Sequence, residues 1–488
     1  MPTLTPDTRL LSGAVVIGDD DIRSTSAGEM THTNPATGRE QASFPLAGRA
    51  EVDAAVAAAR RAQPIWAGMP PQRRQAILRR IAELAVEHAH EFATINTLET
   101  GTPYAGFHAM IKDRFPAWFN YYAGWIEKLP GETSELGYDR PFNLTVFEPV
   151  GVVVKILTWN GPLNNIYMSV APALAAGCTV VIKPPELAPF GAIRFAQLCR
   201  EAGLPSGAVS VLPGGPETGK MLVSHPEVDK ISFTGGTSTG KLIQASAGEA
   251  LTPLVMELGG KSAHIVFADA DLDRVAAQQI TFCRLAGQVC TAPTRLLVQD
   301  SIYDETVERV RAAFDRIVVG DPFDAAVEMG PVINAAAKER ISGMIDRAES
   351  TGATVIRSPL PLSGQLADGS FLPPMMVLDA AFDSEIMREE VFGPVVTVGR
   401  FSTEDEAIGY ANDSRFGLAA YLHTRDISRA LKAASLLEAG SIGINGGPAP
   451  ASYAAPFGGV RQSGYGREGG REGIMEFLRT KNINIVLG

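Results

Sequence analysis

Short apolar strands alternate with helices from Val150 onward, and this alternation limits the possible folds more than any other feature of the chain. The strands are β-branched runs bounded by proline or glycine. A strand–helix–strand repeat at this spacing predicts right-handed crossovers on a parallel sheet. In the first half of the pattern the predicted strands are 152–158, 179–182, 208–212 and 230–233, with helices at 168–176, 190–202 and 217–224.

The same alternation resumes after Glu257. Its predicted strands are 264–267, 295–298, 394–399 and 441–444, and its predicted helices are 272–285, 303–317, 404–412 and 428–437. The two halves together predict an α/β fold with two doubly wound parallel-sheet domains that meet near 257–261. A chain of 488 residues is long enough for two or three domains.

The N-terminal part of the chain is predicted to be helical after an irregular start. The first 30 residues are polar and without pattern, which indicates a loosely held arm. Apolar residues then recur with a helical period in two segments, 52–59 and 77–84. Gly101 is the expected stop signal of the second helical region.

Composition argues against several classes of function. The 43 basic and 54 acidic residues give a net charge of −11, so nucleic acid is not an expected partner. The longest apolar stretches fall short of the roughly 20 residues that span a bilayer, and the N-terminus does not read as a signal peptide. Four scattered cysteines without a CxxC pair indicate a reducing compartment. The expected location is cytoplasmic, and no metal site or membrane partner is predicted.

Cys290 is the candidate nucleophile. It follows Gly287-Gln288-Val289 just after the predicted helix 272–285, and glycine there lets a loop pass close to a bound substrate. A thiol with a pKa of ~8.5 is only a few per cent thiolate at neutral pH, so a base or a helix dipole must assist it. Taken alone, a cysteine is more often a small buried hydrophobe, and that is the prediction for the other three, Cys178, Cys199 and Cys283.

Two further motifs supply a carboxylate and an amide. Glu257 ends a strand-like run and precedes Leu258-Gly259-Gly260, and Asn160 lies in Thr158-Trp159-Asn160-Gly161-Pro162 after the strand 152–158. Read singly, each would more often be an ordinary turn residue. Together with a thiol, they are the base and the hydrogen-bond donor that acyl transfer through a thioester requires.

In this order the three motifs resemble those of the aldehyde dehydrogenase superfamily. The match begins near Asn34-Pro35-Ala36-Thr37-Gly38 and covers nearly the whole chain. It implies NAD-dependent oxidation of an aldehyde to its carboxylic acid through a thiohemiacetal and a thioester. Cys290 would attack the aldehyde, Asn160 and the cysteine's own N–H would form an oxyanion hole, and Glu257 would activate the hydrolytic water.

Two sequence elements are candidates for the cofactor site. Lys183 and Glu186 follow a predicted strand and could hold the ribose hydroxyls, with Glu186 repelling a 2′-phosphate and so favouring NAD over NADP. A charged strand-to-helix loop is the ordinary alternative. Gly235, Gly236 and Gly240 follow a strand and open a helix, as a phosphate-binding turn must, although their GGxxxG spacing is not GxGxxG.

The resemblance adds cofactor contacts elsewhere in the chain. The family's glutamate at the position of Glu390 binds the nicotinamide ribose, and the aromatic residue at Phe392 packs beside it. Trp159 and Leu258 complete the predicted cofactor set. The run from Pro456 to Gly464 resembles the family's closing loop and is expected to be structural.

Departures from the family's motifs concern mainly the substrate. Gly161 stands where many members carry an aromatic residue in the aldehyde tunnel, which hints at a bulky aromatic or terpenoid aldehyde. Segment 161–168 holds no basic residue, which disfavours semialdehydes of diacids. Ser169 stands where lysine is frequent, so a proton relay through that position is in doubt. The residues predicted to bind the substrate are Gly161, Asn164, Asn165, Met168, Val289 and Thr291, with Trp118 and Tyr121 as further tunnel candidates.

Two short strand-like segments, 142–147 and 482–487, lie outside the alternation. An exposed apolar terminal strand must pair with something, and in the resembled family such strands build an oligomerisation arm. A homodimer or homotetramer is therefore expected. The predicted domains are 1–128 with 150–257 for NAD binding, 258–456 for catalysis, and 129–149 with 475–488 for the arm.

Three other functions fit parts of the sequence. An acylating dehydrogenase would hand the acyl group to coenzyme A, but such members commonly lack the glutamate at Glu257. A non-catalytic NAD-binding protein on the same fold should show degraded motifs, whereas thiol, base and amide are all present. A cysteine esterase would not need the glycine turn at Gly235.

Overall fold

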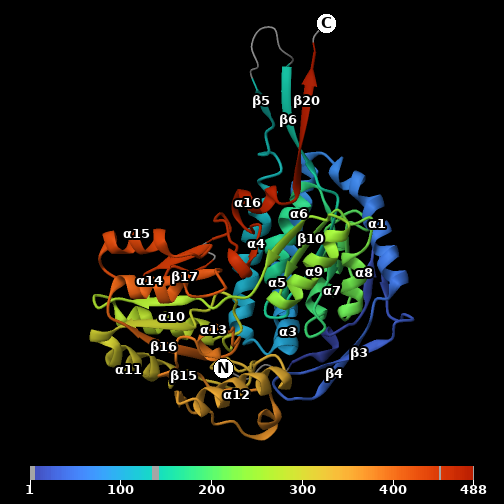
Figure 1. Ribbon diagram of the computed structural model, residues 1–488. Coiled ribbons are helices and arrows are strands. Elements are labelled where there is room, and N and C mark those ends of the chain that lie inside the picture. The colour runs from blue at the N-terminus through green and yellow to red at the C-terminus, as the bar shows by residue number, and fades with distance from the viewer. Residues whose placement is uncertain (1–5, 135–141, 450–451, 487–488) are drawn as a thin grey trace.

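The computed structural model of the chain contains two large sheets, each in its own lobe, and a three-stranded sheet that projects from the body (Figure 1). It describes residues 6–134, 142–449 and 452–486. The lobe on the right of Figure 1 is built from the first half of the chain, and the lobe on the left from the second half. The prediction of an α/β fold with two mainly parallel sheets and a small β arm is confirmed.

The first large sheet has eight strands, of which the five central ones run parallel. Its strands β7 and β8 are valine-rich and buried along their whole length, as expected for parallel strands covered on both faces. In order across the sheet the strands are β19 (Gly464–Tyr465), β11 (Leu254–Glu257), β10 (Lys230–Thr234), β7 (Val152–Ile156), β8 (Thr179–Lys183), β9 (Val209–Val211), β1 (Val15–Ile17) and β2 (Asp20–Ile22).

The helices of this lobe bury alanine, leucine and aromatic side chains against the sheet and against one another. A small two-stranded sheet, β3 (Glu29–Thr33) and β4 (Glu40–Pro45), precedes them. The helices are α1 (Arg49–Ala67), α2 (Pro71–Glu87), α3 (Ala89–Thr100), α4 (Tyr104–Ala123), α5 (Pro162–Asn165), α6 (Ala171–Ala176), α7 (Phe190–Glu201), α8 (Pro216–Val223) and α9 (Thr237–Glu249).

Two predictions for the N-terminal region are wrong. The first 30 residues are not a loose arm, because Val16 pairs with Val211 and adds β1 and β2 to the first sheet. Strands of three residues are too short for their alternation to be read from sequence. The second helical region ends at Thr100, before Gly101, as predicted, but it is two helices, α2 and α3, separated at His88. Helix α4 follows as an unpredicted helix with a buried aromatic face.

The second large sheet has seven strands, with an antiparallel strand at one edge. Strand β17 was not predicted, because its sequence, Ala-Ala-Tyr-Leu-His, contains no β-branched residue. The strands, in order, are β14 (Thr354–Arg357), β15 (Met375–Leu378), β16 (Val395–Phe401), β13 (Arg295–Gln299), β12 (Ala263–Val266), β17 (Ala419–His423) and β18 (Ser441–Ile444). Its helices are α10 (Leu272–Cys283), α11 (Tyr303–Phe314), α12 (Ala335–Ser350), α13 (Glu385–Arg388), α14 (Glu404–Asn412) and α15 (Ile427–Leu436).

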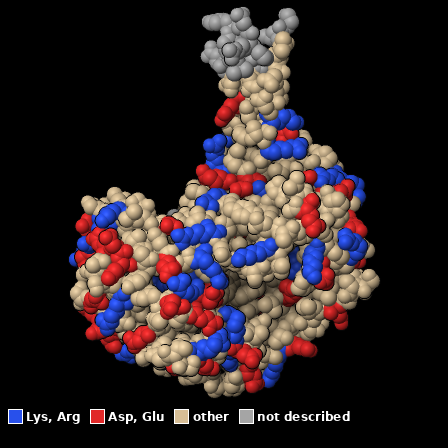
Figure 2. Space-filling view, viewed as in Figure 1, with Lys and Arg blue, Asp and Glu red and all other residues tan. Residues whose placement is uncertain are grey.

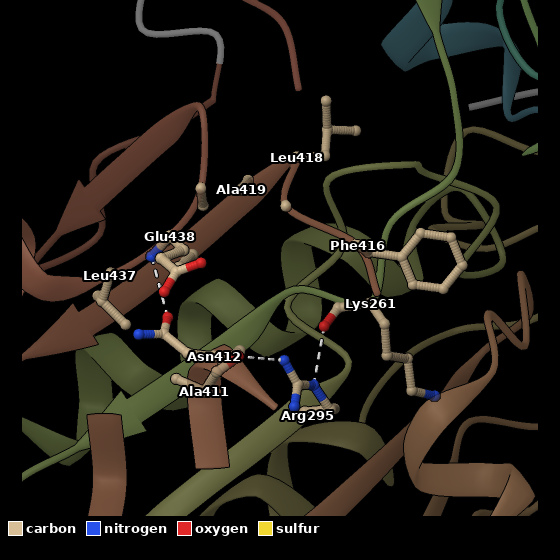
Figure 3. A pocket seen from close by; sticks show the side chains of 13 residues that line it. Lys261, Arg295, Ala411, Asn412, Phe416, Leu418, Ala419, Leu437 and Glu438 are labelled. Atoms are coloured by element: carbon tan, nitrogen blue, oxygen red, sulfur yellow. Dashed lines mark hydrogen bonds between the residues drawn. The ribbon is translucent and has the colours of Figure 1, made fainter. Parts of the chain in front are cut away.

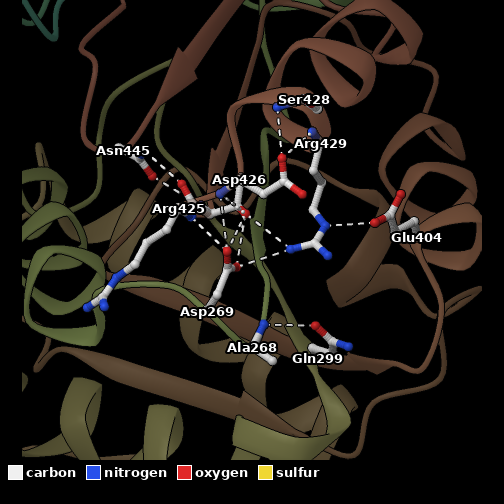
Figure 4. A network of polar contacts seen from close by, with 10 residues as sticks. Ala268, Asp269, Gln299, Glu404, Arg425, Asp426, Ser428, Arg429 and Asn445 are labelled. Carbon is white, nitrogen blue, oxygen red and sulfur yellow. Dashed lines mark hydrogen bonds and ion pairs between the residues drawn. The ribbon is translucent and has the colours of Figure 1, made fainter.

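Asp269 ties the ends of β12 and β17 together (Figure 4). Its carboxylate accepts hydrogen bonds from the Thr424 hydroxyl and the Arg425 N–H, each at 2.9 Å, and from the Arg429 guanidinium at 3.3 Å. Asn445 braces the same turn from the next strand through both ends of its amide. This network fixes the loop between β17 and α15.

The projecting sheet joins the two segments that the sequence set apart. β20 (Leu478–Ile485) pairs antiparallel with β6 (Phe142–Pro149) over eight residue pairs, and β5 (Glu132–Ser134) lies on the other side of β6. A short helix, α16 (Gly470–Met475), leads into β20. The parts of the predicted arm at 135–141 and 487–488 lie outside the described residues.

The parallel strands of the first sheet bring the predicted motifs to one edge. Asn160 follows β7, Gly235 follows β10, and Glu257 is the last residue of β11. Carboxyl ends of parallel strands meet at the same edge, where α/β proteins bind their ligands. The surface is hollowed between the two lobes, and charges of both signs are interspersed around the hollow (Figure 2). Among the described residues, no helix combines the length and the apolar character needed to cross a bilayer.

Candidate active site

A cavity of about 680 Å³ lies between the two lobes and contains most of the predicted site. All three predicted catalytic residues, Cys290, Glu257 and Asn160, line it. The six predicted substrate residues line it as well. Of the predicted cofactor residues, those at the cavity wall are Trp159, Gly235, Gly236, Leu258, Glu390 and Phe392, whereas Lys183, Glu186 and Gly240 are not among its lining residues.

Cys290 is carried on a tight loop that only glycine permits. Gly287 has a φ of +68°, and a Cβ there would lie 1.8 Å from the carbonyl oxygen of Gly393. Gln288 holds the loop from the other side, because its Oε1 accepts the Ile333 N–H at 2.8 Å. Although the Cys290 residue is only partly buried, burial of its thiol, followed by the charges of three carboxylates, Glu390, Glu257 and Glu468, raises its pKa to about 12.

Asn160 reaches across the cavity to the cysteine loop. Its Nδ2 donates a hydrogen bond to the Gln288 carbonyl at 2.8 Å. An amide NH₂ group has two hydrogens to donate, so this bond orients the amide and leaves one hydrogen for a substrate oxygen. The geometry is compatible with the donor role predicted for Asn160.

Glu257 is a buried carboxylate with no protein hydrogen bond. It is only 4% exposed, and neither of its oxygens has a hydrogen-bond partner in the described part of the chain. Burial first, and then the negative charge of Glu468, raise the pKa of Glu257 well above its usual range, while Lys155 opposes this shift. A carboxyl group whose pKa is raised in this way, lining the same cavity as a thiol, is a candidate general base.

Two residues beside Glu257 were missed by the sequence analysis. Glu468 lines the cavity and is 4% exposed, and its Oε1 lies 3.5 Å from the Nζ of Lys155, which is 1% exposed. A lysine inside a run of valines and isoleucines is itself a signal, because a buried charge requires a partner. Glu468 carried no such signal, since it lies in an irregular segment just beyond the predicted closing loop.

The cofactor candidates fall into two groups. Lys183 and Glu186 form an ion pair of 3.2 Å at the carboxyl end of β8, so both alternatives left open for them, a ribose clamp and a charged loop, fit this geometry. Gly235 and Gly236 lead from β10 into α9. Gly240 lies in the first turns of α9, and a Cβ there would be 2.8 Å from a methyl of Leu258, so the helix packs closely against Leu258 at this position.

Glu390 and Phe392 form the opposite wall. Oε1 of Glu390 accepts the Gly260 N–H at 3.0 Å, and burial raises the pKa of Glu390 to about 7. Phe392 adopts a left-handed φ of +49° and packs edge-on against Trp159, with ring centroids 5.3 Å apart. Strained backbone of this type is typical of ligand sites.

Arg295 anchors the segment behind this wall (Figure 3). Its guanidinium donates to three carbonyl oxygens, those of Lys261, Tyr410 and Ala411, at 2.7–2.8 Å. The Lys261 ammonium points away from Arg295, and burial lowers its pKa to about 7. Arg295 therefore fixes the backbone that continues from Glu257 into the second sheet.

The substrate end of the cavity is aromatic and polar. The Oδ1 of Asn164 is buried without a hydrogen-bond partner among the described residues, whereas the Thr291 carbonyl accepts from Tyr421 at 2.9 Å. Ser169 donates to the Asn165 carbonyl at 2.6 Å inside a π-helical turn, Ile166–Val170, and does not line the cavity. Lining residues that the sequence analysis did not include in the site include Asp113, Arg114, Thr234, Arg340, Ser452 and Tyr453, in addition to Glu468.

Comparison with known proteins gives the family. The family model described as "Aldehyde dehydrogenase family" matches residues 22–483. The chain belongs to the aldehyde dehydrogenase family. The resemblance inferred from the motifs is therefore confirmed, and the protein is an enzyme of that family.

Curated relatives of this aldehyde dehydrogenase match over nearly its full length. Human retinal dehydrogenase 2 is 39% identical, over 99% of this chain and 94% of the relative. The chloroplastic betaine aldehyde dehydrogenase of Beta vulgaris is 37% identical, over 92% of this chain and 91% of the relative.

Solved structures agree with the fold throughout. Betaine aldehyde dehydrogenase of Staphylococcus aureus in complex with NAD+ is 37% identical and matches with a TM-score of 0.94, covering 98% of this chain and 96% of that one. An NADP dependent enzyme of E. coli also matches with a TM-score of 0.94, at 35% identity and over 99% of both chains. Close structural relatives have thus been crystallised with NAD+.

Proposed function

We propose that this aldehyde dehydrogenase is of the hydrolytic type, which oxidises an aldehyde with NAD and releases the free acid. The observation that carries the proposal is the buried Glu257 carboxylate, which lines the same cavity as Cys290 and has no hydrogen-bond partner among the described residues. A base is needed to deprotonate water, whereas transfer to coenzyme A brings its own nucleophile.

The residues at the carboxyl edge of the first sheet suit a dinucleotide. Helix α9 begins after Gly236 without a side-chain cap, so its first N–H groups remain for phosphate oxygens. A Cβ at Gly236 would meet no atom within 4 Å, which leaves room for a ligand. Lys183 and Glu186 would hold the adenosine ribose and Glu390 the nicotinamide ribose. NAD bound there supplies the acceptor for the hydride.

The first chemical step uses Cys290 and Asn160. The thiol loses its proton to a base, Glu257 being the available carboxylate, and the sulfur attacks the aldehyde carbonyl to form a thiohemiacetal. The Asn160 amide and the Cys290 N–H donate hydrogen bonds to the resulting oxyanion, and a donor of this kind contributes about 3 kcal/mol to the transition state. Loss of hydride then leaves a thioester on Cys290.

Hydrolysis of the thioester returns the enzyme to its starting state. Glu257 first releases the proton taken from the thiol to solvent, and it then takes a proton from water as the water oxygen bonds to the acyl carbon. The carbon–sulfur bond breaks, the acid departs, and the proton on Glu257 balances the thiolate that remains. One oxygen of the acid comes from this water.

The substrate is proposed to be a bulky aromatic or terpenoid aldehyde. The size of the cavity, the small residue at Gly161, and the aromatic side chains of Trp118, Tyr167 and Tyr453 support this proposal. Similarity to retinal dehydrogenase 2 points the same way, whereas the betaine aldehyde dehydrogenases point to a small cationic aldehyde. Arg114 also lines the cavity, so a semialdehyde belongs among the compounds tested.

The experiment that tests the proposal is NADH formation by purified protein without coenzyme A. Aliphatic, aromatic, terpenoid, cationic and acid-bearing aldehydes would be compared, with Cys290→Ala as the control. Turnover that the control lacks would support hydrolytic oxidation and rank the substrates. Turnover that requires coenzyme A would favour the acylating alternative, and binding of NAD without turnover would favour a non-catalytic role.

A homo-oligomer is proposed from the projecting sheet. The outer edge of β20 has no strand beside it in the described chain, and Ile483, Ile485 and Val486 are exposed there. Unpaired apolar edges of this kind favour pairing with another chain. Light scattering would measure the mass in solution, and a monomer would contradict the proposal.

A further inference from the structure

Lys155 is a buried cation whose surroundings connect it to the catalytic carboxylate. It is the last residue but one of β7, and its Nζ donates hydrogen bonds to Thr234 at 2.8 Å and Ser232 at 3.2 Å on the neighbouring strand β10. Thr234 stands opposite Glu257 in the register between β10 and β11. Lys155 and Glu257 therefore belong to the same sheet, and strand β10 lies between β7, which carries the lysine, and β11, which carries the glutamate.

Glu468 joins this lysine to the cavity. Its carboxylate makes an ion pair of 3.5 Å with Lys155 and lines the cavity together with Glu257. Its backbone is held at both ends by hydrogen bonds with Phe457, at 2.6 and 2.7 Å. In the described part of the chain, Glu468 makes no other ion pair and Glu257 makes none.

The positive charge of Lys155 allows both neighbouring carboxylates, Glu257 and Glu468, to be ionised. Two buried carboxylates that face one cavity cannot easily be ionised together, and without a cation they share one proton. With Lys155 protonated, the cluster of Glu257, Glu468 and Lys155 has a net charge of −1 when both carboxylates are ionised. The other charges that act on Glu257 are Arg467, which favours the anion, and Glu476, which opposes it, and the Cys290 thiol lines the same cavity.

We propose that Lys155 is a positioning residue for hydrolysis: paired with Glu468, it allows Glu257 to be ionised while it faces the thioester. This inference rests on the hydrolytic function proposed above. Lys155 is not among the residues that line the cavity, so its effect would pass through the two carboxylates. A purely structural lysine would only tie β7 to β10 through Ser232 and Thr234.

The test is the pH dependence of turnover in Lys155→Met, which keeps an unbranched side chain one atom shorter and removes its charge. The ascending limb of the kcat profile should move to higher pH, and a shift of one unit lowers turnover about tenfold on that limb. Because hydrolysis would then be slow, the variant should give a burst of one NADH per active site. Raising the pH should restore its steady-state rate.

Two further variants separate charge from structure. Ser232→Ala removes a hydrogen bond of Lys155 but keeps the ammonium, so its pH profile should match the wild type. Glu468→Gln removes the neighbouring negative charge, so the ascending limb should move to lower pH, which keeps the proposal testable if Lys155→Met does not fold. In the double variant Lys155→Met/Glu468→Gln the limb should return towards the wild-type position.

The outcomes that would overturn the inference are specific. An unchanged profile in Lys155→Met, or a shift to higher pH in Glu468→Gln, would contradict it. So would a loss of turnover in Lys155→Met that has no burst and no recovery at high pH. If the wild type itself forms NADH only with coenzyme A, the proposed function fails instead, and the two failures are thereby distinguished.

Discussion

Asn160 donates a hydrogen bond to the carbonyl of Gln288 at 2.8 Å, and this contact joins the first sheet to the loop that carries Cys290, the candidate nucleophile. Asn160 follows β7 in one lobe, and Gln288 follows α10 in the other. The two residues are 128 positions apart in sequence. Asn160, the candidate oxyanion donor, therefore also holds the two walls of the cavity in position relative to each other.

Replacing this amide should lower turnover more than it lowers stability. We expect Asn160→Ala to reduce kcat about 10²- to 10³-fold, the usual effect of removing one oxyanion donor. Asn160→Asp keeps the shape of the side chain but places a carboxylate where an oxyanion should form, so it should be at least as impaired. Steady-state kinetics with a thermal melt would check this, and near-normal kcat in either variant would contradict the donor role.

The Cys290 thiol should be slow to react in the protein without NAD. Because burial and three carboxylates raise its pKa to about 12, alkylation by iodoacetamide should rise about tenfold per pH unit from pH 8 to 10. Glu390→Gln removes the largest of the three charge effects and should speed alkylation at each pH. Peptide mapping by mass spectrometry would follow Cys290, with the fully buried Cys178, Cys199 and Cys283 as internal controls. A rate that levels off near pH 8 would contradict the expectation.

The sequence predicted the alternating core of the fold because valine-rich parallel strands such as β7 and β8 leave a strong local pattern. It did not predict β1 and β17, whose strand state depends on partners distant in the chain: Val211 pairs with Val16, and β12 pairs with β17. Their own residues carry too little β-propensity or length to be read. Helix α4 was missed for a related reason, since it is apolar on more than one face and shows no clean period.

The site residues that could be predicted from the sequence are those that lie in short motifs. Cys290, Glu257 and Asn160 came from three short signatures, and the structure brings them to one cavity. Arg114 and Glu468 reach that cavity from segments without a motif, and only tertiary structure reveals their neighbours. Lys155 lies between these cases, because a charge in a buried strand could have been noticed before its partner was known.

Asp269 should stabilise the protein above its own titration range. Partial burial raises the pKa of Asp269, but hydrogen bonds from Thr424 and Arg425 and the charge of Arg429 lower it overall. Since the folded pKa is below the unfolded value of about 3.9, the stabilisation is fully present above pH ~5 and is lost as pH falls through the folded pKa.

Asp269→Asn should therefore be destabilised near neutral pH and resemble the wild type in acid. Because the carboxylate is partly exposed, we expect a loss of about 1 kcal/mol at pH 7. Urea unfolding at pH 7 and at pH 3 would measure the difference. An equal gap between the two proteins at both pH values would contradict the role given to the ionised carboxylate.

Glu186 should decide between NAD and NADP. Its carboxylate lies 3.2 Å from the Lys183 ammonium, where it would accept the ribose hydroxyl of NAD and repel a 2′-phosphate. Glu186→Gln should lower the preference for NAD about tenfold, mostly through a lower KM for NADP, because one like-charge repulsion is removed. Kinetics with both cofactors would check it. An unchanged ratio would leave the Lys183–Glu186 pair as a charged loop, the alternative that the sequence left open.

Gly161 should set the width of the aldehyde site. Its φ of −175° is open to any residue, and a Cβ there would lie 3.2–3.3 Å from the Asn164 side chain, which borders the cavity and can turn aside. Gly161→Phe would fill space at the wall, so kcat/KM for aromatic and terpenoid aldehydes should fall about 5- to 30-fold, as loss of about 1–2 kcal/mol of fit implies. Short aliphatic aldehydes should be oxidised as before.

Gly161→Ala, which adds one methyl group, is the matched control and should change kcat/KM for both classes of aldehyde little. If Gly161→Phe slows short and bulky aldehydes alike, the residue acts on the position of Asn160 rather than on substrate size, and the proposal of a bulky substrate loses its main structural support.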